Sequence, residues 1–520
     1  MIHILELALL PEEAANEEKI KARAASKLVV SPSEISHLKL LKRSIDARAK
    51  QVLIRLQAEV YINENPPELG SLTPDYPNVS GKKQILIVGS GPGGLFAALK
   101  VIEKGFKPVI LERGKDVQSR RRDLAAINKE HLVNPDSNYC FGEGGAGTYS
   151  DGKLYTRSVK RGNVRKILEL LVAHGANERI LIDAHPHIGT NKLPKLIQSI
   201  RQTILDHGGE IHFNTRVTDF LFEGREIKGI KTASGDHLPS KAVILASGHS
   251  ARDIFELFQR KGLIIEPKAF ALGVRVEHPQ GLIDQIQYHC SARGPYLPAA
   301  SYNLATQVNS KGVYSFCMCP GGFIVPSATA PGEVVVNGMS PSKRDSKFAN
   351  SGIVVEVGKA ALKPFLQFGV LAAMQLQKSV EQKAFEAGGK TQTAPAQRMV
   401  DFVNDKLSPS LPETSYQPGI KSVMLKDVLP GYIAEALKKS FKDFGKKMPG
   451  YFTNEAVLVG VESRTSSPVR IPRDPETLLH PQLKNLFPCG EGAGYAGGII
   501  SAAMDGEKCA EKAVEYIMAL

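Results

Sequence analysis

The chain has no tryptophan, only six cysteines among its 520 residues, and no long hydrophobic run. Scattered cysteines without the paired CxxC spacing of a zinc site are too few for the disulfide framework of a small secreted protein. Apolar runs such as 85–88 fall far short of the roughly 20 residues of a membrane span, and the first ten residues lack a basic signal-peptide segment. His185 and His187 have no identifiable partners for a metal. We therefore expect a cytoplasmic protein with no metal and no membrane partner.

The formal net charge of +13 is dispersed along the sequence. The short basic runs, 120–122 and the lysines between 438 and 447, are typical of solvated helix faces. An excess of basic residues suits an anionic ligand, an anionic substrate or nucleic acid. The weak clustering favours a small-molecule substrate over nucleic acid without deciding the question. Nothing in the sequence indicates the oligomeric state.

A glycine-rich turn directly follows the apolar segment 85–88. The chain continues as Gly89-Ser90-Gly91-Pro92-Gly93-Gly94 and then as the helical stretch 95–104, so GxGxxG stands where a strand turns into a helix. Glycines allow the tight turn and a close approach to a pyrophosphate, and the helix N-terminus offers N–H donors. A second strand, 108–111, ends at Glu112, whose carboxylate can accept hydrogen bonds from an adenosine ribose. This unit predicts a Rossmann-type site for NAD or FAD.

A later segment resembles a motif of the glutathione-reductase-type FAD superfamily. Residues 241–250, KAVILASGHS, are similar to its apolar strand that ends in an Ala-Thr-Gly turn. Ala246, Ser247 and Gly248 form that turn here, with serine in place of threonine. The resemblance implies that the dinucleotide is FAD.

A second segment, 485–506, with the sequence NLFPCGEGAGYAGGIISAAMDG, is similar to the late FAD motif of the same superfamily. Glu491 stands in place of the more usual aspartate, and the resemblance places it beside the ribityl or pyrophosphate region. A helix N-terminus at the flavin pyrimidine edge suits the negative charge of a reduced flavin. The residues that this motif assigns to the cofactor are Gly490, Glu491, Gly498, Ile499 and Ile500.

The closest resemblance is to uncharacterised bacterial FAD-dependent dehydrogenases, NAD(P)/FAD-dependent oxidoreductases with an N-terminal appended module, and it covers nearly the whole chain. It is carried by 138–154, NYCFGEGGAGTYSDGKL, by 317–322, CMCPGG, and by 461–470, VESRTSSPVR. The first segment is glycine-rich, so its backbone can lie close to the isoalloxazine or pyrophosphate, with Lys153 reaching an anionic oxygen. Further residues expected beside the cofactor are Arg113, Gly145, Gly147, Asp151, Gly152 and Val217.

No residue identifies itself as the catalytic acid or base. Cys317 and Cys319 are candidates for a redox dithiol or a thiolate near the flavin, although buried strand cysteines are commonly inert. Arg464, followed by the hydroxyl residues 465–467, has the planar fork that binds a carboxylate or a phosphate. For each of these three candidates a purely structural role remains the alternative.

The strand and helix pattern predicts an α/β fold with α+β parts: a Rossmann-type FAD-binding domain, an inserted mixed substrate domain and a small N-terminal βαβ-type module. In that module, helical sequence lies between the strand-like segments 2–10 and 52–60, and Ser31, Pro32 and Glu34 have the spacing of a capping box. The expected boundaries are 1–65 for the module, 66–83 for a Pro- and Gly-rich linker, 84–262 for the first part of the FAD-binding domain, 263–453 for the substrate or cap domain, and 454–520 for the C-terminal part of the FAD-binding domain.

The leading hypothesis is an FAD-dependent oxidoreductase, a dehydrogenase that moves a hydride between a small organic substrate and the flavin. A flavin-dependent RNA-modifying enzyme and a non-catalytic flavin-binding interaction protein are the alternatives. Past Gly94 the chain has no second strand–GxGxxG–helix unit, since the glycines of 142–147 lead into sequence without a helical pattern. If NAD(P)H is an electron donor, we expect it to bind only transiently in the substrate cavity.

Overall fold

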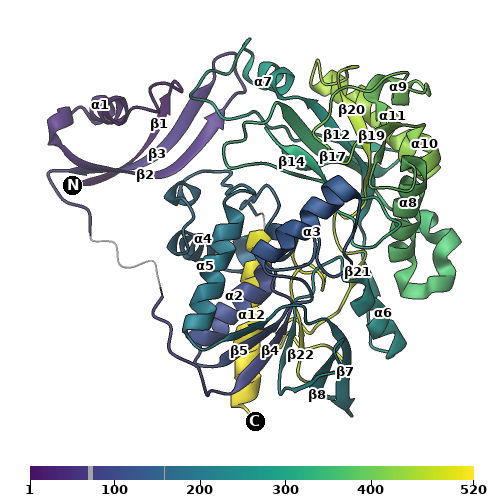
Figure 1. Ribbon diagram of the computed structural model, residues 1–520. Coiled ribbons are helices and arrows are strands. Elements are labelled where there is room, and N and C mark those ends of the chain that lie inside the picture. The colour runs from purple at the N-terminus through teal and green to yellow at the C-terminus, as the bar shows by residue number, and fades with distance from the viewer. Residues whose placement is uncertain (68–73, 157–158) are drawn as a thin grey trace.

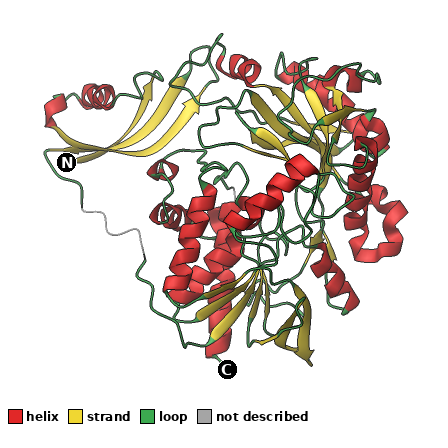
Figure 2. Ribbon diagram, in the orientation of Figure 1, coloured by secondary structure: helices red, strands yellow, loops and turns green. Residues whose placement is uncertain are grey.

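The computed structural model describes residues 1–67, 74–156 and 159–520, so part of the expected linker, 68–73, lies outside the described residues. An N-terminal sheet, a domain with a parallel sheet and a mixed domain with a large sheet lie side by side (Figure 1). Figure 2 shows that helices cover the sheets of the second and third parts. Among the described residues, no helix combines the length and apolar character needed to cross a membrane.

The parallel sheet has five strands in the order β22-β10-β4-β5-β6. Their bounds are Leu486–Pro488 for β22, Val243–Leu245 for β10, Gln84–Val88 for β4, Lys107–Leu111 for β5 and Glu210–His212 for β6. All four neighbouring pairs are parallel, which is the arrangement of a Rossmann-type domain. The predicted α/β fold with such a domain is confirmed.

The central strand β4 is apolar on both faces because both faces are covered. On one face of the sheet, Ile85 and Ile87 pack against the helices α2 (Pro92–Glu103), α5 (Leu193–Asp206) and α12 (Ile499–Met518). Leu86 and Val88 pack on the opposite side with residues of α6 (Arg252–Arg260) and β7 (Val217–Glu223). A strand buried on both faces reads as a continuous hydrophobic run, which explains the sequence ILIV at this position.

The mixed domain is built on a seven-stranded sheet in the order β13-β14-β17-β12-β20-β18-β19. Its largest apolar cluster joins this sheet to the helices α8 (Ala372–Gly388) and α11 (Gly431–Lys447). These helices lie on the outer side of the domain in Figure 1. The strand bounds are Ala271–Pro279 for β12, Ala305–Val308 for β13, Lys311–Cys319 for β14, Phe348–Glu356 for β17, Ala394–Arg398 for β18, Ile420–Ser422 for β19 and Val457–Glu462 for β20.

One expected domain boundary is wrong. The strand β20 falls in the range 454–520 that was assigned to the FAD-binding domain, but it pairs with β12 and β18 in the sheet of the mixed domain. All six of its residues are buried there. A short apolar strand carries no mark of the sheet that it joins, so its sequence alone did not place it.

The N-terminal module is antiparallel and not of the expected βαβ type. Its strands are β1 (Ile2–Leu9), β2 (Ile35–Asp46) and β3 (Leu53–Ile62), in the order β1-β3-β2, with α1 (Glu17–Leu28) packed on the sheet. The Ser31 capping box forms, but it opens only a three-residue 3-10 turn before β2 begins. The helical sequence expected between the first and last strands is therefore α1 alone, followed by this short turn, and 35–46 is a strand instead.

The remaining elements are mostly short. The helices are α3 Val117–Glu130, α4 Val164–Ala173, α6 Arg252–Arg260, α7 Gln280–Tyr288, α9 Met399–Val403 and α10 Leu425–Val428, with a 3-10 segment at Lys359–Leu371. The strands are β7 Val217–Glu223, β8 Glu226–Thr232, β9 His237–Pro239, β11 Glu266–Pro267, β15 Phe323–Pro326, β16 Val336–Met339 and β21 Val469–Arg470.

Candidate cofactor site and active site

A cavity of about 400 Å³ lies at the carboxyl ends of the parallel strands. Its wall includes the residues that end or directly follow β4, β5, β10 and β22, which is where open α/β sheets bind their ligands. On the opposite side it is bounded by Phe316, Cys317 and Asn337 of the mixed domain. The cavity therefore lies between the two large domains, and both supply side chains to it.

The glycines of the turn after β4 have separate structural roles. A Cβ at Gly94 would lie 1.9 Å from the carbonyl oxygen of Gly89, so Gly94 allows the helix to pack on the strand. A Cβ at Gly91 would meet only the Cα of Gly145, at 4.0 Å, and would project into the cavity. Gly91 therefore keeps open a space that the fold itself does not fill.

All but three of the predicted cofactor-binding residues line the cavity. Ser90 lies buried beneath it, Gly94 packs against Gly89, and Ile500 faces the apolar core behind the first turn of α12. The residues that line it are Gly89, Gly91, Pro92, Gly93, Glu112, Arg113, Gly145, Gly147, Asp151, Gly152, Lys153, Val217, Ala246, Ser247, Gly248, Gly490, Glu491, Gly498 and Ile499.

Glu112 is more heavily engaged than the ribose role requires. One carboxylate oxygen accepts hydrogen bonds from the Ser90 backbone N–H at 2.9 Å and from its hydroxyl at 2.7 Å. The other oxygen accepts from the backbone N–H groups of Gly114 and Gly142, at 2.9 and 3.0 Å. All four lone-pair directions are thus used by the chain itself. A ribose hydroxyl would have to replace the Ser90 hydroxyl.

The late motif is fixed by a buried ionic contact. Asp505 of α12 accepts a hydrogen bond from the Gly490 N–H at 2.7 Å and another from the Arg473 guanidinium at 3.0 Å. The thiols of Cys489 and Cys509 lie with the Asp505 carboxylate in one cluster whose ligand atoms are within 4.8 Å of one another. The Arg473 guanidinium approaches the Cys509 sulfur at 3.3 Å, so this cluster already holds a cation.

The sequence prediction did not name several residues that line the cavity, and Cys140 and His249 are two of them. His249 directly follows the Ala246-Ser247-Gly248 turn, and its Nδ1 lies 3.4 Å from a carboxylate oxygen of Glu491. Burial opposes a charge on this imidazole, but the Glu491 carboxylate holds the pKa of His249 above its ordinary value. Cys140 lies in the quoted segment 138–154, so both residues stand within or beside motifs that pointed to the cofactor.

The two candidate cysteines of the CMCPGG segment occupy different environments. Cys317 lines the cavity, and its sulfur lies 4.0 Å from Nζ of Lys153. Cys319 is buried behind it. The Lys153 ammonium also donates to the Met318 carbonyl and lies 3.8 Å from a carboxylate oxygen of Asp151. Lysine, thiol and carboxylate thus meet at the end of the cavity formed by the mixed domain.

A buried ion pair lies beneath these thiols. The Arg275 guanidinium of β12 pairs with the Glu462 carboxylate of β20 at 2.7 Å, and both side chains are buried. It also donates to the Asn350 side chain at 2.7 Å and to the Cys317 carbonyl at 3.3 Å. Arg275 thereby anchors the backbone of Cys317 and brings a fixed positive charge close to its sulfur.

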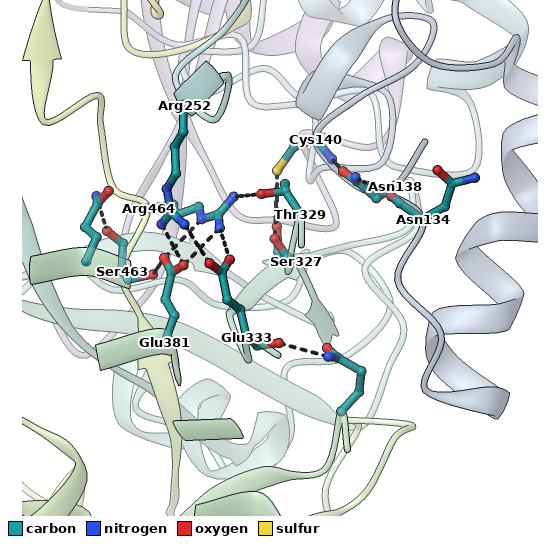
Figure 3. A network of polar contacts seen from close by, with 12 residues as sticks. Asn134, Asn138, Cys140, Arg252, Ser327, Thr329, Glu333, Glu381, Ser463 and Arg464 are labelled. Carbon is teal, nitrogen blue, oxygen red and sulfur yellow. Dashed lines mark hydrogen bonds and ion pairs between the residues drawn. The ribbon is translucent and has the colours of Figure 1, made fainter. Parts of the chain in front are cut away.

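The third catalytic candidate, Arg464, is held within a network of four charged side chains (Figure 3). Its guanidinium donates to both oxygens of Glu381, at 3.1 and 3.0 Å, to Glu333 at 3.1 Å, and to the Thr329 hydroxyl at 2.6 Å. Arg252 donates to the same two carboxylates at 2.9 and 2.7 Å. Arg464 lines the cavity, but its guanidinium, which was expected to bind a substrate anion, is already paired with the carboxylates of Glu381 and Glu333.

Comparison with known proteins decides the family. An uncharacterized protein of Clostridium beijerinckii is 39% identical over 517 residues, which cover 95% of this chain and 96% of that protein. A family model described as "FAD-dependent protein, C-terminal domain-like" matches 269–465, and one described as "FAD dependent oxidoreductase" matches 185–303. The chain belongs to this FAD-dependent oxidoreductase family. A domain of unknown function matches 1–61, which is the N-terminal module.

Solved structures are more distantly similar. CtdE in complex with FAD has a TM-score of 0.34 and 11% identity, covering 84% of this chain and 88% of that one. A geranylgeranyl bacteriochlorophyll reductase-like protein from Thermoplasma acidophilum has a TM-score of 0.35 and 14% identity, covering 84% of this chain and 80% of that one. Similarity at this level says nothing about the activity of this oxidoreductase.

The cofactor of this oxidoreductase is FAD, and the residues of the cavity fit it. A Cβ placed on Gly248, Gly490 or Gly498 would meet no atom within 4 Å, although all three glycines line the cavity. Together with Gly91 they form a wall of bare backbone facing an unfilled space. Such a wall lets a dinucleotide approach the main chain closely, which is the purpose of glycine in these motifs.

Proposed function

We propose that this oxidoreductase is a dehydrogenase that transfers a hydride between a small organic substrate and FAD. The observation that carries the proposal is one continuous cavity that runs from the dinucleotide turn at Gly91 to the side chains of Lys153 and Cys317. Bound FAD supplies hydride acceptance and donation at its N5 atom. The substrate would occupy the end of the cavity that the mixed domain closes.

The N-terminus of α12 supports this use of the cavity. Gly498 is extended and lines the cavity, and the helix begins at Ile499. The free N–H groups of a first helical turn carry partial positive charge. Directed at a flavin pyrimidine edge, they would stabilise the negative charge that accompanies reduction. This is also the point that favours membership in the glutathione-reductase-type superfamily.

Lys153 is the residue best placed to orient a substrate. Burial opposes its charge, but the neighbouring thiols of Cys317 and Cys319 and the Asp151 carboxylate raise its pKa, so it remains an ammonium at neutral pH. Phe316 adds an aromatic surface to the same region of the cavity. A cation beside an aromatic ring suits a small substrate with an apolar body and a carboxylate or carbonyl oxygen.

Anaerobic reduction of the bound flavin by a panel of small organic donors tests the proposal. We expect donors of one chemical class to bleach the visible absorbance of the flavin, and Lys153→Met to raise the donor concentration needed for half-maximal rate at least tenfold. Gln382→Ala, a substitution on α8 outside this cavity, is the control. If no donor reduces the flavin and no acceptor reoxidises it faster than free FAD, the protein is a flavin-binding interaction protein.

Location and macromolecular partners also belong to the proposal. All six cysteines are free, which suits a reducing, cytoplasmic location. Co-purification of tRNA, or a shift of the protein by added tRNA, would favour an RNA-modifying enzyme over the dehydrogenase. The same donor panel would then leave the flavin oxidised until RNA was present.

A further inference from the structure

The thiols of Cys317 and Cys319 lie close together at the cavity, although the chain between them is extended. Residues two apart in a strand are roughly 6.6 Å apart, at the upper end of the Cα separation that a disulfide spans. The pairing of β14 with β17 shifts register between Phe316 and Cys319, so one extra residue bulges there. Cys317 adopts a left-handed backbone conformation in this bulge, with φ of 46°. A bulge bends the strand and brings its flanking residues closer.

The strained conformation is held from below. The Cys317 carbonyl accepts a hydrogen bond from the buried Arg275 guanidinium at 3.3 Å, and Arg275 is itself fixed by Glu462. A non-glycine residue with positive φ costs of order 1–3 kcal/mol and persists only where the surrounding structure enforces it. The arrangement presents the Cys317 sulfur to the cavity and leaves Cys319 buried behind it.

The two thiols are also unequal electrostatically. The hydrogen bond from the Cys319 thiol lowers the pKa of Cys317 to about 5, against the effect of burial, and the Lys153 ammonium and Arg275 guanidinium add to this lowering. The same hydrogen bond and burial raise the pKa of Cys319 well above its ordinary value. At neutral pH the pair is therefore one thiolate, which faces the cavity, and one thiol, whose sulfur also lies 3.2 Å from the Cys317 carbonyl oxygen.

We propose that Cys317 and Cys319 form a redox-active dithiol that exchanges two electrons with the bound FAD. In the oxidising direction the S–H bond of Cys319 breaks, a bond forms between the two sulfurs, and FAD gains two electrons and that one proton. Thiolate and thiol thus become a disulfide while the flavin becomes its anionic reduced form, so charge and atoms balance. The reverse step returns both electrons to the sulfurs. The proposal rests on the proposed function in that FAD occupies this cavity.

The test uses full-length holoenzyme, air-oxidised and then illuminated under nitrogen with EDTA, because light delivers electrons through the flavin alone. Samples are denatured in excess maleimide before and after illumination, and labelled cysteines are located by mass spectrometry. We expect Cys317 and Cys319 to be unlabelled in the dark sample and labelled after illumination. Full reduction should take about four electron equivalents per chain, two for the flavin and two for the disulfide.

Serine variants give the matched controls. Cys317→Ser/Cys319→Ser should retain FAD and take up only about two electron equivalents, whereas Cys290→Ser, at a thiol outside the cavity, should still take up about four. Cys489→Ser tests the rival pair, Cys489 with Cys509. The hydrogen bond with Cys509 and burial raise the pKa of Cys489 well above its ordinary value, and the Cys509 sulfur is already in contact with the Arg473 guanidinium, so we expect no loss of electron capacity.

Two results would overturn the proposal. One is labelling of both cysteines in the air-oxidised dark sample, and the other is a flavin that bleaches fully while the Cys317–Cys319 disulfide stays closed. Loss of two equivalents in Cys489→Ser and none in the Cys317→Ser/Cys319→Ser variant would move the dithiol to the rival pair. None of these readouts needs a substrate, so failure of the dithiol is distinguishable from failure of the proposed dehydrogenase activity.

Discussion

The Arg464 guanidinium and the Glu381 carboxylate lie 3.0 Å apart in a buried network that joins three parts of the chain. Arg464 follows β20, Glu381 lies on α8, and Arg252, which shares both carboxylates, begins α6. Since α6 packs against the parallel sheet and α8 against the large mixed sheet, the network fixes one domain relative to the other. The width of the cavity between these domains therefore depends on this network, and one of its members, Arg464, lines the cavity.

Removing Arg464 should destabilise the protein. Arg464→Met leaves the buried carboxylates of Glu381 and Glu333 with one cation in place of two, and breaking a buried ion pair costs about 3–5 kcal/mol. Thermal unfolding should show a midpoint several degrees lower. Lys347→Met, which removes the exposed pair with Glu413, should shift the midpoint little. An unchanged midpoint with a raised KM would show instead that Arg464 contacts the substrate.

Gly91→Val should give a folded protein without FAD. The added Cβ would meet only the Gly145 Cα, at 4.0 Å, and Gly91 lines the cavity, so the valine side chain would project into the cavity. We expect at least a tenfold loss of bound FAD with the circular dichroism of the folded chain retained. The released cofactor of the unaltered protein should be FAD and not FMN, as chromatography of the heat-released flavin will show.

Gly94→Ala is the contrasting variant, because its Cβ would lie 1.9 Å from the carbonyl oxygen of Gly89. It should lower the unfolding midpoint whether or not FAD is present. Full retention of FAD by Gly91→Val would contradict the assignment of Gly91 to the FAD-binding wall of the cavity. If both variants lose FAD and stability to the same extent, then Gly91 and Gly94 do not have the separate roles of cofactor binding and helix packing.

The sequence predicted the parts of the fold that local patterns determine. The two strands expected at 85–88 and 108–111 are β4 and β5, each beginning one residue earlier, because continuous apolar runs are typical of strands buried in a parallel sheet. The sheet to which β20 belongs and the antiparallel order of the N-terminal module depend on long-range pairing, which short apolar strands do not encode. The capping box at Ser31 shows the same limit, because it fixes the start of a helical turn but not the number of residues in it.

In the candidate site, too, local motifs could be predicted from the sequence and long-range contacts could not. Gly91 and Gly490 could be read from motifs because glycine at fixed spacing reports a backbone requirement. The ion pairs of Arg464 with Glu333 and Glu381 could not be predicted from the sequence, because these partners lie more than eighty residues away in the chain. The contact of His249 with Glu491 could not be predicted either, because it forms only when β10 and β22 lie side by side.

If NAD(P)H reduces the flavin, it should do so by a ping-pong mechanism. The sequence has one strand–GxGxxG–helix unit, and its turn already faces the cavity at the ends of the parallel strands. The donor would have to enter the same cavity as the acceptor and leave before it binds. Steady-state rates should then give parallel double-reciprocal lines for donor and acceptor. Intersecting lines, or NAD(P)H bound on a separate site away from the flavin, would contradict this expectation.

His278 should make stability depend on pH. Its Nε2 lies 2.9 Å from the Tyr451 carbonyl, to which it donates, and its buried Nδ1 has no partner among the described residues. Burial lowers the pKa of His278 to about 4, compared with about 6.5 in an unfolded chain. Between these values the unfolded state binds a proton that the folded state does not, so stability falls as the pH falls from about 6.5 to about 4.

The expected loss is about 3 kcal/mol over that window, since each pH unit contributes about 1.4 kcal/mol per proton. Thermal midpoints measured from pH 7.5 to 4 should show a slope that His278→Gln reduces, because glutamine keeps a donor for the Tyr451 carbonyl but does not titrate. His237→Gln, at an exposed histidine, should leave the slope unchanged. His187 responds in the same direction, its pKa being lowered to about 4 by burial and by Arg344. Burial also lowers the pKa values of His174 and His480, so part of the slope should persist in His278→Gln. A slope that is identical in the unaltered protein and in His278→Gln would show that this imidazole is protonated in the folded chain and that its surroundings admit a charge.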